Sequence, residues 1–246
     1  AGETLSTTVE IYETTEDDAG IVIDRAHLII QPLAEAVQVG QMTITSNTGP
    51  ATYVGRAPAG GERPATLRFA LPPGAEDIRF ESGELGGRFI RTAEGVADTV
   101  PVVPGEAVNQ VVLSYNLPAR TGSWELEYRF LYPVRTLNVL VSAGGWELSS
   151  DDLAFAGSMG GEMAFLNYVA EGVPAGKVVS LQFTPAEEQA PAGMGAAPPA
   201  GPVAGRSLQP ALLWATAALC LILLAAVFTY PGWRGAISGD GRRADE

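Results

Sequence analysis

Apolar and polar residues alternate along most of the chain between residues 20 and 184. In residues 107–117, Val111, Leu113, Tyr115 and Leu117 fall on one side, with polar residues opposite. A period of two is the pattern of a β-strand that has one buried face and one solvent face. Further runs of this kind predict strands at 21–30, 37–46, 65–71, 78–81, 134–142, 145–149, 162–169 and 177–183.

The run after residue 123 is rich in aromatic residues. Apolar side chains at Trp124, Leu126, Tyr128, Phe130 and Tyr132 alternate with Glu125, Glu127 and Arg129. Such a row can form a sugar-stacking platform, but strict alternation with charged residues favours the inner face of a strand.

Residues 21–30 predict a strand with two mixed faces. Simple alternation places Val22, Asp24, Ala26 and Leu28 on one face and Ile21, Ile23, His27 and Ile29 on the other, where Arg25 interrupts.

Many short strands joined by Gly, Pro and Asn turns predict a mainly β fold, an antiparallel β-sandwich. Each strand has one apolar face, so two sheets can bury these faces against each other. We expect one large sandwich over residues 20–184, with two smaller ones divided near 118–122 as the alternative. Residues 1–19 form a separate N-terminal segment.

Residues 211–230 read ALLWATAALCLILLAAVFTY and contain no charge. Twenty helical residues span about 30 Å, the thickness of a bilayer core. The aromatic residues Trp214, Tyr230 and Trp233 stand near the two ends of the run, as they do at membrane interfaces. We therefore predict one transmembrane helix, in which Cys220 is a packing residue.

Basic residues set the predicted orientation. Arg234, Arg242 and Arg243 follow the span, whereas the twenty residues before it contain only Arg206. The excess of cations places residues 231–246 in the cytoplasm and the β region outside the cell membrane. Residues 185–210, rich in Pro, Ala and Gly, predict a disordered stalk between the two.

The composition excludes several classes of function. With 15 Lys and Arg against 28 Asp and Glu, the net charge is −13, which argues against nucleic acid as a partner. One His and one Cys cannot build a Cys/His zinc site, an intrachain disulfide or a haem-attachment motif. We expect no cofactor, with Ca²⁺ as the one weak candidate.

Two kinds of titratable residue remain as candidates for chemistry. His27 is the only imidazole, but it sits in an apolar run, which favours a structural role over a catalytic base. Carboxylates gather in three predicted turns, at 16–18, 76–77 and 151–152. Asp17, Asp18, Asp151 and Asp152 are weak calcium candidates, because hard oxygen ligands suit Ca²⁺ although the DxDxDG spacing is missing. A glycosidase acid–base pair and plain solvated turns are the other readings.

Five stretches together resemble a family of bacterial membrane-anchored proteins known as carboxypeptidase regulatory-like: 12–30 (YETTEDDAGIVIDRAHLII), 45–55 (TSNTGPATYVG), 67–105, 111–118 (VVLSYNLP) and 132–141 (YPVRTLNVLV). The resemblance implies a bacterial cell-membrane location and no peptidase activity. In that family a transthyretin-like β domain precedes this region; here it is missing, and residues 3–13 resemble its final strand. The resemblance also implies an accessory role in cytochrome c maturation as an alternative function.

The sequence thus predicts a non-catalytic, single-pass membrane protein. Its partners would be the lipid bilayer and other membrane or envelope proteins, which the outward β region binds or scaffolds. A carboxylate-based glycan hydrolase is a less favoured alternative.

Overall fold

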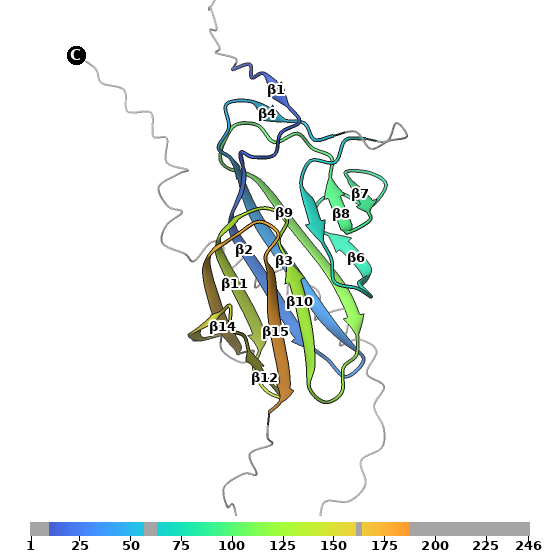
Figure 1. The fold of residues 1–246 in the computed structure, drawn as a ribbon. Helices are drawn as coiled ribbons and strands as arrows, with labels where there is room; N and C mark the ends of the chain where they lie inside the picture. Colours follow the sequence, from blue (N-terminus) through green and yellow to red (C-terminus); the bar gives the residue numbers. More distant parts are fainter. Residues whose placement is uncertain (1–9, 57–62, 161–163, 187–246) are drawn as a thin grey trace, which may run out of the picture. The chain divides into compact units, whose positions relative to one another are not determined.

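The structure is a computed structural model that describes residues 10–56, 63–160 and 164–186 (Figure 1). All of these residues belong to the first of the chain's two units, residues 1–190. Strands and the turns between them make up this part of the chain, so the protein is mainly β, as predicted.

The strands are as follows: β1 (Thr14–Thr15), β2 (Ile21–Pro32), β3 (Ala36–Asn47), β4 (Thr52–Tyr53), β5 (Arg68–Ala70), β6 (Glu76–Phe80), β7 (Phe89–Thr92), β8 (Gly95–Asp98), β9 (Gly105–Pro118), β10 (Trp124–Arg129), β11 (Val134–Ser142), β12 (Trp146–Ser149), β13 (Ala154–Met159), β14 (Phe165–Val173) and β15 (Val178–Pro185). Most predicted strands are found within a few residues of their expected positions. Strands β1, β4, β7, β8 and β13 were not predicted, and the acids at 76–77 lie in β6 rather than in a turn.

The strands form several sheets. A seven-stranded sheet has the order β13-β14-β11-β2-β3-β9-β6, and two three-stranded sheets have the orders β10-β15-β12 and β5-β8-β7. The short strands β1 and β4 form a fourth sheet. Strands from both sides of residues 118–122 lie in the large sheet, because β11 and β14 join β2, β3 and β9 there.

Pairing in the large sheet is antiparallel with one exception. Strands β2 and β11 run parallel, with His27 opposite Asn138 and Leu28 opposite Val139. The expectation of a wholly antiparallel arrangement is therefore wrong at this pair, and β1 and β4 are also parallel. Parallel neighbours need a long connection, which the chain between β2 and β11 supplies.

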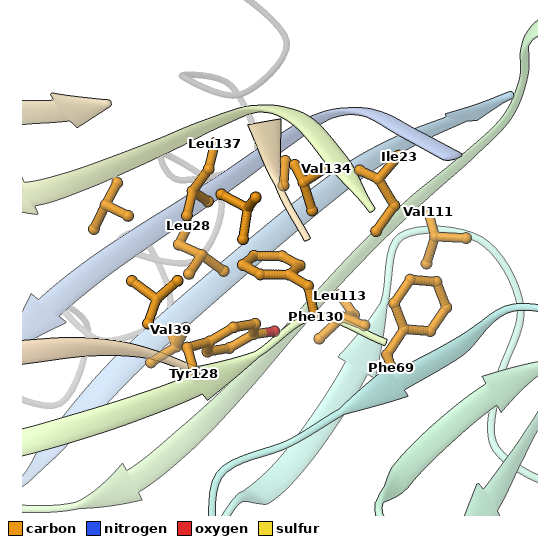
Figure 2. Close-up of a cluster of buried hydrophobic side chains, with 14 of the residues drawn as sticks. Ile23, Leu28, Val39, Phe69, Val111, Leu113, Tyr128, Phe130, Val134 and Leu137 are labelled. Atoms are coloured by element: carbon orange, nitrogen blue, oxygen red, sulfur yellow. The ribbon is translucent and has the colours of Figure 1, made fainter. Parts of the chain in front are cut away.

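One apolar core joins the sheets. The three-stranded sheet containing β10 and β15 lies in front of the large sheet (Figure 1). In Figure 2, Tyr128 and Phe130 point toward Leu28, Val39 and Leu137 of the large sheet, and all five are buried. The predicted inner face is confirmed for Leu126, Tyr128, Phe130 and Tyr132, which are each at most 5% exposed.

The faces predicted for residues 21–30 are wrong because β2 contains a bulge. The register with β3 shifts between Ile23 and Arg25, which leaves Asp24 without a partner in the β2–β3 ladder. An extra residue in a strand moves the following side chains to the opposite face. The core side of β2 therefore passes from Ile21 and Ile23 to Ala26, Leu28 and Ile30.

A line of polar contacts crosses four strands at the level of this bulge. Arg135 in β11 forms an ion pair with Asp24, with 2.9 Å between Nη1 and Oδ1. Ser46 in β3 donates a short hydrogen bond to Asp24 and accepts one of 2.8 Å from the backbone N–H of Ala107 in β9. Ala107 has a φ of 49°, where the β3–β9 register also shifts. The serine thus satisfies a backbone donor that the irregular ladder leaves free.

Gly95 allows β8 to pair closely with β5 in the β5-β8-β7 sheet. Its φ is 152°, and a Cβ built there would lie 2.3 Å from the Phe69 carbonyl oxygen. Strand β8 can approach β5 at this point only because the residue has no side chain.

Among the described residues there is no helix of the length and hydrophobicity that crossing a bilayer requires. The predicted span 211–230, its anchor residues Trp214, Tyr230, Trp233 and Arg234, most of the stalk and the first nine residues lie outside the described ranges. The predictions made for them stay predictions.

Candidate functional site

His27 lies in β2 between two central neighbours of the large sheet. Its register partners are Met42 in β3 and Asn138 in β11, neither of which is a nucleophile or a carboxylate. Burial, with a smaller contribution from the charge of Arg25, lowers the pKa of His27 to about 4. The imidazole is therefore neutral at pH 7, and its surroundings fit the structural role predicted for it.

Asp17 and Asp18 lie in the turn before β2. Asp17 accepts a hydrogen bond of 3.0 Å from the backbone N–H of Ala19, which closes an Asx turn. Asp18 forms an ion pair of 3.3 Å with Arg68 of β5. A guanidinium already neutralises this carboxylate, so a calcium ion would have to displace it.

Asp151 and Asp152 lie in the turn between β12 and β13. Lys177 Nζ is 2.8 Å from Asp152 Oδ1, and the backbone N–H of Ser180 donates to Oδ2 at 3.3 Å. These contacts, the lysine first, lower the pKa of Asp152. Asp151 is exposed. The structure thus ties Asp152 to the start of β15 and leaves its neighbour in solvent.

The four calcium candidates do not form one site. Asp18 is held by β5 and Asp152 by the β15 region, which belong to different sheets. No group of three or more His, Cys, Asp or Glu side chains within residues 10–56, 63–160 and 164–186 is arranged to hold a metal.

A small pocket lies between the end of β6 and the neighbouring part of β9. The sequence did not predict it. Its volume is about 200 Å³, and its lining combines charged, polar and apolar side chains: Glu81, Ser82, Arg88, Phe89, Gln110, Val111 and Val112. Pockets for drug-sized ligands are larger, roughly 300–1,000 Å³. This one has room for a single side chain or a small polar group.

Arg88 is the cation of this pocket, and its charge is already compensated. Its Nε lies 2.9 Å from Asp98 Oδ1, and its Nη2 lies 2.5 Å from Oδ2 of the same, fully buried carboxylate. The backbone N–H of Val100 also donates to Asp98 at 3.0 Å. The hydrogen bond to Asp98 raises the pKa of Arg88 above its ordinary value. The pair therefore serves first to hold β7 against β8.

Aromatic rings complete the wall beside Arg88. Phe80 and Phe89 stack with centroids 3.7 Å apart, and the Arg88 guanidinium lies 5.0 Å from the Phe89 ring centroid. The sequence signal that could have revealed this wall is the short hairpin 89–98, in which two four-residue runs flank Ala93-Glu94. Its runs are too short to show a clear period of two.

Comparisons with known proteins leave the family open. No family model matches the sequence, and no curated protein matches it. One solved structure with partial similarity is described as a "putative protease" from Parabacteroides distasonis ATCC 8503. The match has 8% identity and a TM-score of 0.36, and it covers 68% of this chain and 40% of the other. Similarity of this degree carries no argument about function.

Proposed function

We propose that this protein is a single-pass membrane protein that presents its β region outside the bacterial cell membrane to bind or scaffold other proteins. The observation that carries the proposal is the uncharged run 211–230, with cations concentrated after it. A run of this length and composition inserts into bilayers, and the positive flank stays in the cytoplasm.

The arrangement of the polar groups supports a binding role over a catalytic one. Two of the acids considered for hydrolysis are used in ion pairs, Asp18 with Arg68 and Asp152 with Lys177, while Asp151 is exposed. The one imidazole lies on a central strand beside Met42 and Asn138. The carboxylate hydrolase considered above therefore stays the less favoured alternative.

Extraction by alkaline carbonate tests the anchor. The wild-type chain should remain with the membrane pellet. A Leu221→Arg/Leu224→Arg variant should be released, since each arginine at the middle of a span costs about 2.5–3.5 kcal/mol on insertion scales. Leu208→Arg, before the run, is the matched control and should stay in the pellet. Release of the wild-type chain would contradict the proposal.

Protease added to intact cells or spheroplasts tests the orientation. Cleavage of the β region without lysis is expected, while a tag after Glu246 should stay protected until the cells are lysed. If the β region survives in intact cells and is lost only on lysis, the outward orientation is wrong.

Crosslinking in the membrane, followed by identification of the captured proteins, tests the binding role. The family resemblance directs attention to haem-handling membrane proteins, because it implies an accessory role in cytochrome c maturation. If other envelope proteins are captured and haem-handling proteins are not, the accessory role in cytochrome c maturation is ruled out, and the proposed scaffolding role is retained.

A further inference from the structure

Strand β6 pairs with only part of β9. The ladder between them reaches Phe80, opposite Leu113, and the backbone N–H of Glu81 then donates to the Val112 carbonyl at 3.1 Å. Beyond this bond, no strand of the described residues pairs with β9 on the β6 side. In an antiparallel ladder, the backbone groups of alternate residues point to the same side of the strand. The N–H and C=O of Gln110, two residues before Val112, therefore face the side that β6 leaves open.

Gln110 lies in a regular part of β9. The ladder with β3 is regular from Asn109 to Pro118, and its irregularity lies on the other side of Asn109, towards Gly105. Gln110 is also exposed. Bulges protect strand edges against further pairing, and the register places none at this residue. An extended segment can thus form the two backbone hydrogen bonds that Gln110 offers.

The small pocket described above lies at the same position. Gln110 and the next two residues of β9 belong to its lining, together with Glu81 after β6 and Phe89 of β7. A segment that pairs with Gln110 therefore passes along the pocket. With a volume of about 200 Å³, the pocket has room for one side chain of that segment.

The charge of the lining favours a cationic side chain. Of the two charged residues in the lining, Arg88 is already paired with Asp98. Glu81 is exposed and has no ion-pair partner within residues 10–56, 63–160 and 164–186. The pocket therefore offers one uncompensated negative charge, which attracts a cation.

The charge of the whole chain points to a partner of different composition. With a net charge of −13, the chain repels a second copy of itself and attracts a basic protein. The apolar part of the lining, Phe89, Val111 and Val112, suits the hydrocarbon stem of a lysine or arginine whose charged end reaches Glu81.

We propose that the Gln110 backbone and the pocket beside it bind an extended segment of a basic partner protein, with a lysine or arginine of that segment directed to Glu81. Strand pairing supplies affinity from the backbone, and the pocket selects the side chain. The proposal rests on the binding role proposed above and names the surface and the partner chemistry that serve it. Because one short segment makes few contacts, a dissociation constant on the order of 100 μM is expected.

Synthetic peptides test the selection of charge. The full chain, labelled at its N-terminus and held in mild detergent, is titrated with the peptide Thr-Val-Lys-Val-Thr up to about 2 mM, and binding is followed by thermophoresis. The lysine peptide should bind, and Thr-Val-Glu-Val-Thr should bind at least about tenfold more weakly. No binding of the lysine peptide, or equal binding of the two, would overturn the proposal.

Two variants of the chain test the position of the site. Glu81→Gln should weaken binding of the lysine peptide about fivefold, because it removes the ion pair in the pocket. Glu84→Gln is the matched control. Glu84 is exposed, lies three residues further along the chain and is not part of the lining, so its substitution changes the net charge equally and should leave binding unchanged. An equal effect of both substitutions would mean that only the overall charge attracts the peptide, contrary to the proposal.

Methylation of the peptide backbone tests strand pairing. Neighbouring N–H groups of an extended peptide point to opposite sides, so only one of two can donate to the Gln110 carbonyl. One lysine peptide is methylated at the lysine nitrogen and another at the following valine nitrogen. One of them should bind at least about tenfold more weakly and the other should lose clearly less. Unaltered binding of both would show that no strand pairing occurs, and the proposal would be wrong.

Failure of this proposal and failure of the proposed function are distinguishable. Peptide binding does not depend on the anchor or the orientation, which carbonate extraction and protease treatment test. Partners captured by crosslinking in the membrane, without binding of the lysine peptide, would leave the proposed function standing and remove this site from it.

Discussion

The hydroxyl of Tyr128 in β10 donates a short hydrogen bond to Oε1 of Gln41 in β3, and so joins the two facing sheets inside an apolar core. Tyr128 is 1% exposed and Gln41 2% exposed. A polar bond between two layers fixes which residues face each other more strictly than apolar contacts do, because a shifted partner leaves a buried polar group unsatisfied.

Tyr128→Phe should therefore lower the free energy of unfolding by about 1–3 kcal/mol, since it leaves the Gln41 oxygen buried without a donor. Urea unfolding followed by tryptophan fluorescence measures the loss. Tyr12→Phe is the matched control. The Tyr12 hydroxyl donates a hydrogen bond of 2.7 Å to Glu10 in an exposed position, so this substitution should cost clearly less. Equal losses would contradict the importance of the inter-sheet bond.

Arg88→Met should destabilise the protein by about 3–5 kcal/mol, because it leaves the fully buried Asp98 carboxylate without its cation. Arg129→Met breaks a 2.7 Å ion pair with Glu94, in which both side chains are more than 40% exposed, and should cost at most about 1 kcal/mol. Thermal unfolding of the two variants side by side gives the comparison. Similar small losses would show that Asp98 gains a different partner.

The free energy of unfolding should depend on pH in part because of His27. Its folded-state pKa of about 4 is below the ordinary value of 6.5, so between these values the unfolded chain binds a proton that the folded chain does not. The contribution of His27 to stability should thus fall as the pH drops from 7 to 5, by about 2 kcal/mol.

His27→Gln removes this contribution. The difference in unfolding free energy between the variant and the wild type should therefore move in favour of the variant as the pH falls. A difference that stays constant between pH 7 and pH 5 would show that the imidazole is solvated in the folded state.

The ion pair of Asp152 with Lys177 should also stabilise the protein at neutral pH, and its contribution should be lost in a more acidic range than that of His27. The folded-state pKa of Asp152 is lowered, so the stabilisation is fully present above the unfolded pKa of a carboxyl and is lost as the pH falls through the folded value. Lys177→Met should cost less than about 1 kcal/mol at pH 7, because the lysine is 47% exposed. At acid pH the cost should vanish. Chemical denaturation at both pH values checks this, and an undiminished cost in acid would assign the effect to packing of the lysine stem.

Alternation in the sequence was sufficient to predict the buried side chains where a strand is regular and has one buried face. In β9 and β10, Leu113, Tyr115, Leu126 and Tyr128 are buried as their period of two predicts. In β2 it failed after Ile23, because a bulge depends on the pairing with β3, which lies outside the local pattern.

The candidate site shows the same division. The acids at 17–18 and 151–152 were predicted correctly as turn residues, but their partners Arg68 and Lys177 stand 50 and 25 residues further along the chain, at distances over which a local pattern carries no information. The pocket beside Arg88 was not predicted, since it exists only where β6, β7 and β9 meet.

By itself, the sequence determined the β character of the described residues between 20 and 184, the inward faces of its regular strands and the impossibility of a Cys/His zinc site, an intrachain disulfide or a haem-attachment motif. These follow from composition and from the two-residue repeat of an extended backbone, which are local properties. Only the tertiary structure decided the parallel pairing of β2 with β11, the face reversal at Asp24 and the burial of Asp98 against Arg88. Each depends on which distant segments become neighbours, and that is set by the free energy of the whole packed core.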